Sequence, residues 1–496
     1  MKRFLTIQAF FLVSFFILAS CYKDKGNYDI NPVGEILLGG KTYNAENYNL
    51  QQYDTLKVDA EYTYTGKDTS ALKFKWSIMP INAKPDDTTI VDISTERNLR
   101  YKVVNRVGDY TLRLSIEDPS STVVRSKMFG VKIRPKGASG FMVLYQNVDG
   151  FQDIDVIVDN TKPEVVRDLY TTTNSPQLSG AHKLTYIMNF ANIAGYVYVL
   201  QKDGGQLLND KYQLLQQANA WFDVAPTKIA PTHIHQDPGL GQNVYFINNG
   251  KVHWPNGIRM PFIFFHYASG DYNASKALFM GTYAFIYDDK NHRFMRFDKA
   301  SGSVNPFTAN SEDKFPLGNI GNKSCFYFNH NSALGTAANA NLKPVAYCRD
   351  NVTGQVYAYR LGFFPKLATY AESVKEITEQ SFKEGTAYVN AINNPLTYYA
   401  HQNKLYLYDI NNNTHRLIYT FERQDIRIDV LKTNGTQLVA GVNTTDKAEG
   451  EVYFFKIDGT GSVVGNTHMS KYDGFGKVQD IEMKFNSGGL MGPYWR

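Results

Sequence analysis

The sequence has few cysteines and no long run of charge of one sign, and both absences narrow what the protein can be. Three cysteines among 496 residues exclude a small fold held together by disulfides. Lysine and arginine number 52 against 47 acidic residues, which gives a net charge of +5, and no basic block exceeds two residues. Proteins that bind nucleic acid concentrate positive charge, so this even distribution argues against such a partner.

Short catalytic motifs are also missing. The chain contains no G-x-S-x-G, no H-E-x-x-H, no G-x-x-x-x-G-K-[ST] and no EF-hand loop. Beyond the N-terminus no stretch reaches 18 consecutive apolar residues, so we expect no spanning helix there. We therefore expect no cofactor, and binding is favoured over catalysis.

The N-terminus predicts export. A basic start is followed by a mostly apolar stretch from Phe4 to Leu18, too short to span a membrane comfortably. The stretch ends in the letters L-A-S-C at Cys21, which resemble a bacterial lipobox. We predict a signal peptide over residues 1–20, a lipid on Cys21 and a polar tether over residues 21–32. The lipid would be the only membrane anchor.

Residues 33–135 predict an all-β unit. Short segments alternate apolar and polar residues, which is typical of half-buried strands, and Trp76 lies in the middle of one of them. About a hundred residues of this kind around one tryptophan indicate an immunoglobulin-like β-sandwich, with Trp76 between the sheets. The stretch from Gly108 to Asp118 resembles the G-x-Y-x-V-x-L-x-V-x-D strand of PKD domains, in which Asp118 would fix the turn that leaves the strand.

From Gly140 onwards a different pattern recurs. An apolar strand, a turn of Gly, Asn or Asp and a tyrosine-rich strand follow one another, in a chain with 34 Tyr and 31 Phe. Seven such units begin near residues 141, 195, 244, 283, 345, 396 and 438. Their spacing of about 40 to 60 residues is in the range of four-stranded propeller blades.

We therefore predict a seven-bladed β-propeller over residues 140–485, followed by a tail over residues 486–496. The alternating segment 477–485 comes too late to start a further blade, so we expect it to complete the first one. Only Leu367 to Lys383 has a helical composition, and we expect a surface helix there.

The order of these segments resembles a known family. The block D-K-G-N-Y-D from Asp24 to Asp29, the PKD-like unit and the propeller-like remainder are similar to the PKD-like family of bacterial lipoproteins. The resemblance implies an outer-membrane lipoprotein, often encoded beside SusC/SusD-type nutrient importers, and it brings no catalytic motif. Surface-exposed lipoproteins of this kind usually carry acidic residues just after the lipidated cysteine. Here Asp24 is the one acidic residue in that place, so the resemblance does not decide between the cell surface and the periplasmic face.

Three residues stand out as candidates for a ligand site: His233, His235 and Trp254. On a strand the two histidines would share one face, as two ligands of one metal ion do, and Asp237 follows them. Prolines bound this region, however, so we expect a solvated loop and assign no metal.

The remaining cysteines and the neighbouring carboxylates each allow two interpretations. Cys325 and Cys348 lie in strand-like runs that a hairpin would bring together, so they form either a disulfide or two buried thiols. The neighbours Asp288 and Asp289, like Glu312 and Asp313, suit a glycosidase, but their turn-like surroundings favour a role in local backbone geometry.

Two classes of function follow. The protein is either a non-catalytic accessory that holds a glycan, a peptide or another nutrient for an outer-membrane uptake system, or a propeller-fold hydrolase or lyase that acts on an extracellular polymer. Fold alone does not decide between them, because propellers host both.

Overall fold

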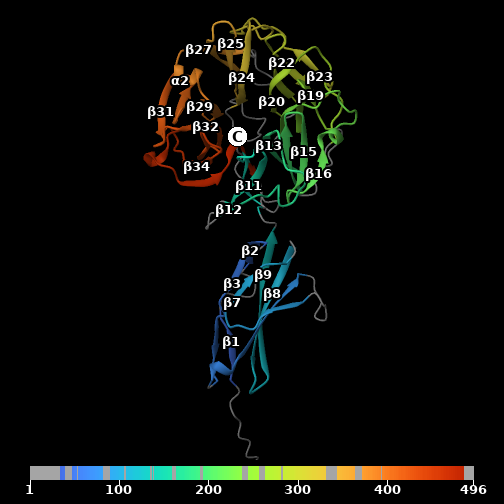
Figure 1. Ribbon diagram of the computed structural model, residues 1–496, viewed down its shortest axis with the longest axis vertical. Coiled ribbons are helices and arrows are strands. Elements are labelled where there is room, and N and C mark those ends of the chain that lie inside the picture. The colour runs from blue at the N-terminus through green and yellow to red at the C-terminus, as the bar shows by residue number, and fades with distance from the viewer. Residues whose placement is uncertain are drawn as a thin grey trace, which may run out of the picture. The chain divides into compact units, whose positions relative to one another are not determined.

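The structure is a computed structural model that describes residues 34–39, 47–52, 54–66, 68–81, 90–105, 108–134, 137, 139–158, 164–189, 194–236, 244–255, 263–280, 283–330, 343–362, 371–392 and 394–484. It divides into two compact units on either side of the bond between Arg134 and Pro135 (Figure 1). Signal peptide, Cys21, tether and C-terminal tail lie outside the described residues. No helix within the described ranges has the length and hydrophobicity needed to cross a bilayer.

In the described part of unit 1, three small sheets surround one apolar core. The largest has the strand order β2 (Asn47–Gln51), β9 (Val123–Arg134), β8 (Gly108–Asp118), β5 (Lys73–Pro80) and β6 (Val91–Ser94). The others pair β3 (Thr55–Val58) with β7 (Leu99–Lys102) and β1 (Ile36–Leu38) with β4 (Tyr62–Tyr64). The core draws side chains from all three sheets, including Leu56, Leu114 and Ile36, which makes the unit immunoglobulin-like.

Trp76 lies in this core, as predicted. Its side chain is fully buried, and its Nε1 donates a hydrogen bond to the carbonyl oxygen of Glu96 at 2.9 Å. The indole stacks on Phe129, with ring centroids 6.2 Å apart. Burying a large ring while satisfying its one polar atom stabilises the contact between the sheets.

Asp118 holds the turn after β8. Its carboxylate accepts hydrogen bonds from the backbone N–H of Ser120 at 2.9 Å and from the Ser121 hydroxyl at 2.8 Å. The Tyr64 hydroxyl donates a third bond, at 2.8 Å. The Ser120 hydroxyl also donates to this carboxylate, at 2.6 Å, and this bond is the largest cause that holds the pKa of Asp118 well below its ordinary value. The predicted role of Asp118 is therefore confirmed.

The described residues of unit 2 form seven antiparallel sheets, numbered here along the chain. Sheet 1 has β10 (Gly140–Gln146), β11 (Gln152–Val158), β12 (Glu164–Val166) and β36 (Lys477–Lys484); sheet 2 has β13 (Ala181–Asn189), β14 (Ala194–Gln201), β15 (Gly204–Asn209) and β16 (Leu214–Gln217); sheet 3 has β17 (Pro231–Gln236), β18 (Val244–Asn248) and β19 (Lys251–His253). Sheet 4 has β20 (Ala274–Met280), β21 (Tyr283–Asp288), β22 (Arg293–Asp298) and β23 (Ser303–Pro306).

The remaining three sheets have four strands each. Sheet 5 has β24 (Lys323–His330), β25 (Pro344–Asp350), β26 (Val356–Leu361) and β27 (Ala371–Ile377); sheet 6 has β28 (Ala387–Asn390), β29 (Leu396–His401), β30 (Lys404–Asp409) and β31 (Thr414–Thr420); sheet 7 has β32 (Ile426–Thr433), β33 (Gln437–Thr444), β34 (Gly450–Lys456) and β35 (Ser470–Phe475). Short helical turns lie at η2 (Ala218–Trp221), α2 (Gln380–Lys383) and η3 (Val464–Asn466). The fold is all-β and propeller-like.

One edge strand of each sheet contacts the corresponding strand of the next sheet. We call these strands the inner strands: β36, β13, β17, β20, β24, β28 and β32. Figure 1 shows several of them around the middle of unit 2, with β16, β23, β27 and β31 towards the rim. The predicted closing strand is among them, because β36 pairs antiparallel with β10 and places Gly140 opposite Lys484.

Turns after the third strand of four sheets use the same local bond. An Asx side chain accepts a hydrogen bond from the backbone N–H two residues later, which fixes a tight turn. The pairs are Asn209 with Lys211, Asp298 with Ala300, Asp409 with Asn411 and Asp458 with Thr460, at 2.8–2.9 Å. These bonds fix the connection from the third to the fourth strand in each of the four sheets.

The helix predicted from Leu367 to Lys383 is wrong. Ala371–Ile377 is the strand β27, and only Gln380–Lys383 is helical. Val356 pairs with Ile377 and Leu361 with Ala371, so the open edge of β26 determines the conformation of this segment. Tertiary pairing overrides a composition that favours helix. Residues 363–370 lie outside the described part.

Candidate functional site

Charged side chains gather on the inner strands of five adjacent sheets. We call this set the central cluster: Lys183 on β13, His233 and His235 on β17, Lys276 on β20, Lys432 on β32, and Asp480 and Glu482 on β36. Lys183 interacts electrostatically with both other lysines and both carboxylates, and His233 with all three lysines. Sheets that are far apart in the sequence thus contribute to one constellation.

Lys183 and His233 form the closest contact between sheets 2 and 3 in the cluster. Lys183 Nζ lies 3.3 Å from His233 Nδ1, and because an ammonium group can only donate, Nδ1 accepts. Burial lowers the pKa of Lys183, and the charge of Lys432 lowers it further. Burial and the charge of Lys183 hold the pKa of His233 well below its ordinary value. His233 is therefore a neutral imidazole at neutral pH.

Lys432 binds both carboxylates of the cluster. Its Nζ lies 3.2 Å from Glu482 Oε2 and 3.6 Å from Asp480 Oδ1. Asp480 Oδ2 also accepts a hydrogen bond from the backbone N–H of Leu184 at 2.9 Å, which ties β36 to β13. Burial alone would lower the pKa of Lys432, but the two carboxylates raise it above its usual range.

Lys276 is the exposed member of the cluster. Within the described residues Lys276 has no ion pair, although Asp289 lies near enough to interact with it electrostatically. Burial raises the pKa of Asp289, which disfavours the carboxylate form that would neutralise Lys276.

His233 and His235 share one face of a strand, not a loop as predicted. They lie on β17, their ring centroids are 6.1 Å apart and the ring planes are within 10° of each other. Pro231 begins the strand, where its missing N–H is tolerated. Over the described ranges, no three His, Cys, Asp or Glu side chains are grouped as a metal site would need. Asp237 lies outside these ranges.

Trp254 is not part of this set. It follows the third strand of sheet 3, and its ring packs against Phe265 and Phe297 at centroid distances of 5.3 and 5.4 Å. Phe297 belongs to the core between sheets 3 and 4. The structure therefore brings His233 and His235 together and places Trp254 in a packing role.

Asp288, one of the paired carboxylates, supports a turn. At the end of β21 it accepts hydrogen bonds from the backbone N–H of Asn273 at 2.8 Å and from the side chains of Asn291 and Arg293 at 2.9 and 2.8 Å. Asp313 likewise accepts from backbone N–H groups, those of Asn310 and Ala371. The interpretation as local backbone geometry holds for both residues.

Cys325 and Cys348 lie directly opposite each other on β24 and β25. Both are buried, and both are free thiols in the structure. Burial, together with the neighbouring Cys325, raises the pKa of Cys348 well above its ordinary value. The register would suit a bond between them, but a disulfide remains a prediction.

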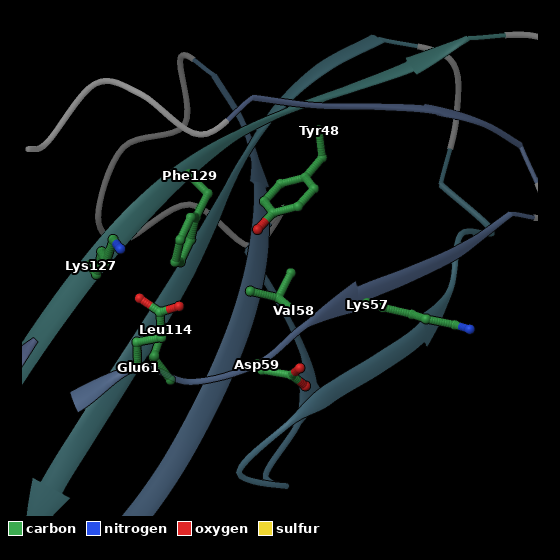
Figure 2. Close-up of a pocket in the computed structure, with 8 residues that line it drawn as sticks. All are labelled: Tyr48, Lys57, Val58, Asp59, Glu61, Leu114, Lys127 and Phe129. Atoms are coloured by element: carbon green, nitrogen blue, oxygen red, sulfur yellow. The ribbon is translucent and has the colours of Figure 1, made fainter. Parts of the chain in front are cut away.

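Unit 1 has a hollow of its own (Figure 2). A groove of about 260 Å³ is lined by Tyr48, Lys57, Val58, Asp59, Glu61, Leu114, Lys127 and Phe129. Two of its charged groups already have partners, because Asp59 pairs with Arg100 at 2.6 Å and Lys127 Nζ donates to the carbonyl oxygen of Gly39 at 2.9 Å. The central cluster draws its ionisable groups from five sheets, and we take it as the candidate site.

Comparison with known sequences gives one family. Residues 21–181 match the profile of the PKD-like family, a span that covers unit 1 and the beginning of unit 2. A comparison with curated proteins finds no match.

Comparison with solved structures gives propeller-like neighbours at low identity. A quinonprotein alcohol dehydrogenase-like protein from Bacteroides thetaiotaomicron has 11% identity and a TM-score of 0.43, over 90% of this chain and 99% of its own. The dihydro-heme d1 dehydrogenase NirN has 10% identity and a TM-score of 0.41, over 76% and 74%. Hsv2 from Kluyveromyces lactis has 9% identity and a TM-score of 0.36, over 67% and 99%.

Proposed function

We propose that this protein is an outer-membrane lipoprotein, anchored through Cys21, that holds a ligand without transforming it. The ligand is a glycan, a peptide or another nutrient, and the protein hands it to a transporter of the SusC/SusD type. The lipobox letters and the PKD-like match over residues 21–181 support the anchored, family-typical part of this proposal.

We further propose that residues 140–485 form a closed seven-bladed propeller. The contact of each inner strand with the next supports this, as does the contact of β36 with both β13 and β32. A closed ring leaves no inner sheet edge exposed. It also brings the inner strands of sheets that are far apart in the sequence around one axis.

The observation that carries the binding function is the central cluster. Ligand sites in proteins combine a concave position with a few convergent polar groups. Lys183, His233 and Lys276 converge from three sheets, and Lys276 is exposed to solvent. Holding these groups together costs desolvation free energy, shown by the lowered pKa values of Lys183 and His233, and a bound ligand would offset that cost.

Affinity and turnover measured side by side test the proposal. The purified protein is incubated with candidate polysaccharides and peptides while binding and product formation are followed. We expect saturable binding with an unchanged ligand, weakened by Lys276→Gln and unaffected by Lys447→Gln, an exposed lysine on the connection between β33 and β34. Steady turnover would contradict the accessory function, and so would an affinity that is the same in both variants.

The Lys183–His233 contact supports a second candidate, a hydrolase or lyase. Burial lowers the pKa of Lys183, so its ammonium group loses a proton more readily than that of an ordinary lysine, which is the property a general base needs. In a lyase it would remove the proton next to a carboxylate group of an acidic polymer. Turnover that Lys183→Met abolishes, with ligand affinity retained, would favour this candidate.

A further inference from the structure

The strands of unit 1 leave an opening into its core. The five-stranded sheet is continuous, whereas the other four described strands form two separate pairs, β3 with β7 and β1 with β4. The chain crosses from β3 to β4 through residues 59–61, whose two acidic side chains line the groove. Val58, Leu114 and Phe129 also line the groove, although each belongs to the core and is at most 6% exposed. The groove therefore reaches apolar side chains of the core (Figure 2).

Two aromatic rings line the groove. The ring centroids of Tyr48 and Phe129 are 6.1 Å apart, and the ring planes make an angle of 58°. Lys127 Nζ lies 5.0 Å from the centre of the Phe129 ring and donates to the carbonyl oxygen of Gly39. An ammonium group has three N–H donors, so this bond leaves donors of Lys127 for a ligand. In Figure 2 the Lys57 ammonium group points away from both rings, so Lys127 is the basic group that faces them.

The charges that line the groove balance. Two lining residues are basic and two are acidic: Lys57, Lys127, Asp59 and Glu61. Asp59 is paired with Arg100 at 2.6 Å, whereas Glu61 is exposed and has no ion pair within the part of the chain that the structure describes. A ligand of either charge would be attracted by half of the lining groups and repelled by the other half. The groove therefore favours a neutral ligand.

The size and the surface of the groove restrict the ligand further. Its volume of about 260 Å³ lies just below the range of small-molecule pockets, which begins at roughly 300 Å³, so it accepts one ring-sized group. A purely apolar group would fit the core side chains but would take Glu61 and Lys127 from water without replacing their hydrogen bonds. A group with one apolar face and several hydroxyls satisfies both parts of the lining.

We infer that the groove is a second ligand site and that it holds one neutral hexopyranose unit of a glycan. The C–H face of the sugar ring packs on Tyr48 and Phe129, and its hydroxyls donate to Glu61 and accept from Lys127. Because a hydroxyl both donates and accepts, one neutral sugar engages groups of both signs. The site goes beyond the proposed function, because it lies in unit 1 and uses none of the residues of the central cluster.

Methyl nuclear magnetic resonance of the whole chain tests this inference. The probes are the methyl glycosides of glucose, galactose and mannose, each compared with its uronic acid and its amino sugar. We expect at least one neutral glycoside to shift the methyl resonances of Val58 and Leu114 saturably, with a dissociation constant of about 1 mM, and its charged forms to bind more weakly. Glu61→Ala should weaken that binding by about tenfold. The control Glu35→Ala, at an exposed position outside the groove, should leave it unchanged.

The outcomes separate the groove from the central cluster. If no neutral glycoside shifts the Val58 and Leu114 resonances, or if Glu61→Ala leaves the affinity unchanged, the inference is overturned. Tighter binding of a uronic acid or an amino sugar would overturn the neutral ligand class. A glycoside that binds without these shifts, and whose binding Lys276→Gln weakens, would place the sugar on the central cluster and leave the proposed function without a second site. Shifts that persist in Lys276→Gln and disappear in Glu61→Ala would support the groove as a separate site.

Discussion

The ammonium nitrogen of Lys484, in the last strand, lies 4.1 Å from the centre of the Tyr212 ring, which follows β15. The same nitrogen donates a hydrogen bond to the carbonyl oxygen of Gly137 at 3.2 Å, and the residue is only 1% exposed. Burial lowers the pKa of Lys484 to about 7, because the ring and two carbonyl oxygens replace water incompletely. A buried lysine of this kind makes stability depend on pH.

The first prediction follows from the sign of this shift. The pKa of a lysine is about 10.4 in the unfolded chain, so between pH 7 and 10 the unfolded state binds more protons than the folded one. Stability should therefore rise with pH by up to about 1.4 kcal/mol per pH unit in this window. Urea unfolding at several pH values should show this rise in wild type and lose it in Lys484→Met. Lys477→Met, an exposed position on the same strand, serves as the control and should keep the slope.

Trp76 gives the second prediction. Because the indole is fully buried and packs on Phe129, Trp76→Ala should lower the free energy of unfolding of unit 1 by about 3–5 kcal/mol. Val124→Ala, on the exposed side of β9, should change it by less than about 0.5 kcal/mol. Urea unfolding followed by circular dichroism measures both. Free quenching of Trp76 fluorescence by iodide in the native protein would remove the residue from the core.

The third prediction concerns the two units. They meet at Arg134 and Pro135, and each has hydrophobic clusters of its own, so the residues between them should be the first to be cut. Limited digestion with trypsin should release two resistant fragments with new ends at Lys136. Lys136→Gln should slow this cleavage and leave cuts elsewhere unchanged. A single fragment that resists digestion throughout would contradict the division.

The fourth prediction concerns the thiols. Cys325 and Cys348 are buried, and the raised pKa of Cys348 removes the reactive thiolate. In the folded protein both should react with a thiol reagent many times more slowly than free cysteine, and unfolding should expose both of them. If denaturation without reductant exposes none, the two sulfurs are bridged, as their register on β24 and β25 would permit.

The fifth prediction tests the anchor. Cys21→Ala removes the sulfur that would receive the lipid, so the variant should no longer take up labelled palmitate or fractionate with the outer membrane. Cys348→Ala should leave labelling unchanged, because that thiol is buried. A Cys21→Ala protein that still incorporates palmitate would show that the lipobox interpretation is wrong.

Local chemistry made part of this fold predictable. Three features follow from patterns a few residues long. Trp76 is an aromatic ring among apolar neighbours, and Asp118 is an acid before a pair of serines. The strand from Lys477 alternates apolar and polar residues. Such patterns predict the same local structure wherever the strand lies in the fold. They need no knowledge of the neighbouring sheet.

The candidate site was only partly predictable, for a physical reason. His233 and His235 attract notice as a pair, but Lys183, Lys276 and Lys432 look like ordinary surface lysines on alternating strands. They meet only because the inner strands of separate sheets converge, which no local pattern encodes. The signal that the sequence offers is an ionisable residue in the strand that precedes several of the successive repeats. Pro231 misled in the other direction, because it begins a strand and does not interrupt one.

The pairing of β36 with β10 sets an order of events for a chain that is synthesised from its N-terminus. Sheets 2 to 7 are each made of consecutive segments and can form hairpin by hairpin as they emerge. Sheet 1 cannot form in this way, because its strand β10 pairs with β36. Gly140 lies opposite Lys484, which follows it by more than three hundred residues. Until β36 has been made, the unpaired edge of β10 can pair with a strand of another chain. Folding of this protein therefore includes an interval in which unit 2 can mispair, and the interval ends only when the last strand has been made.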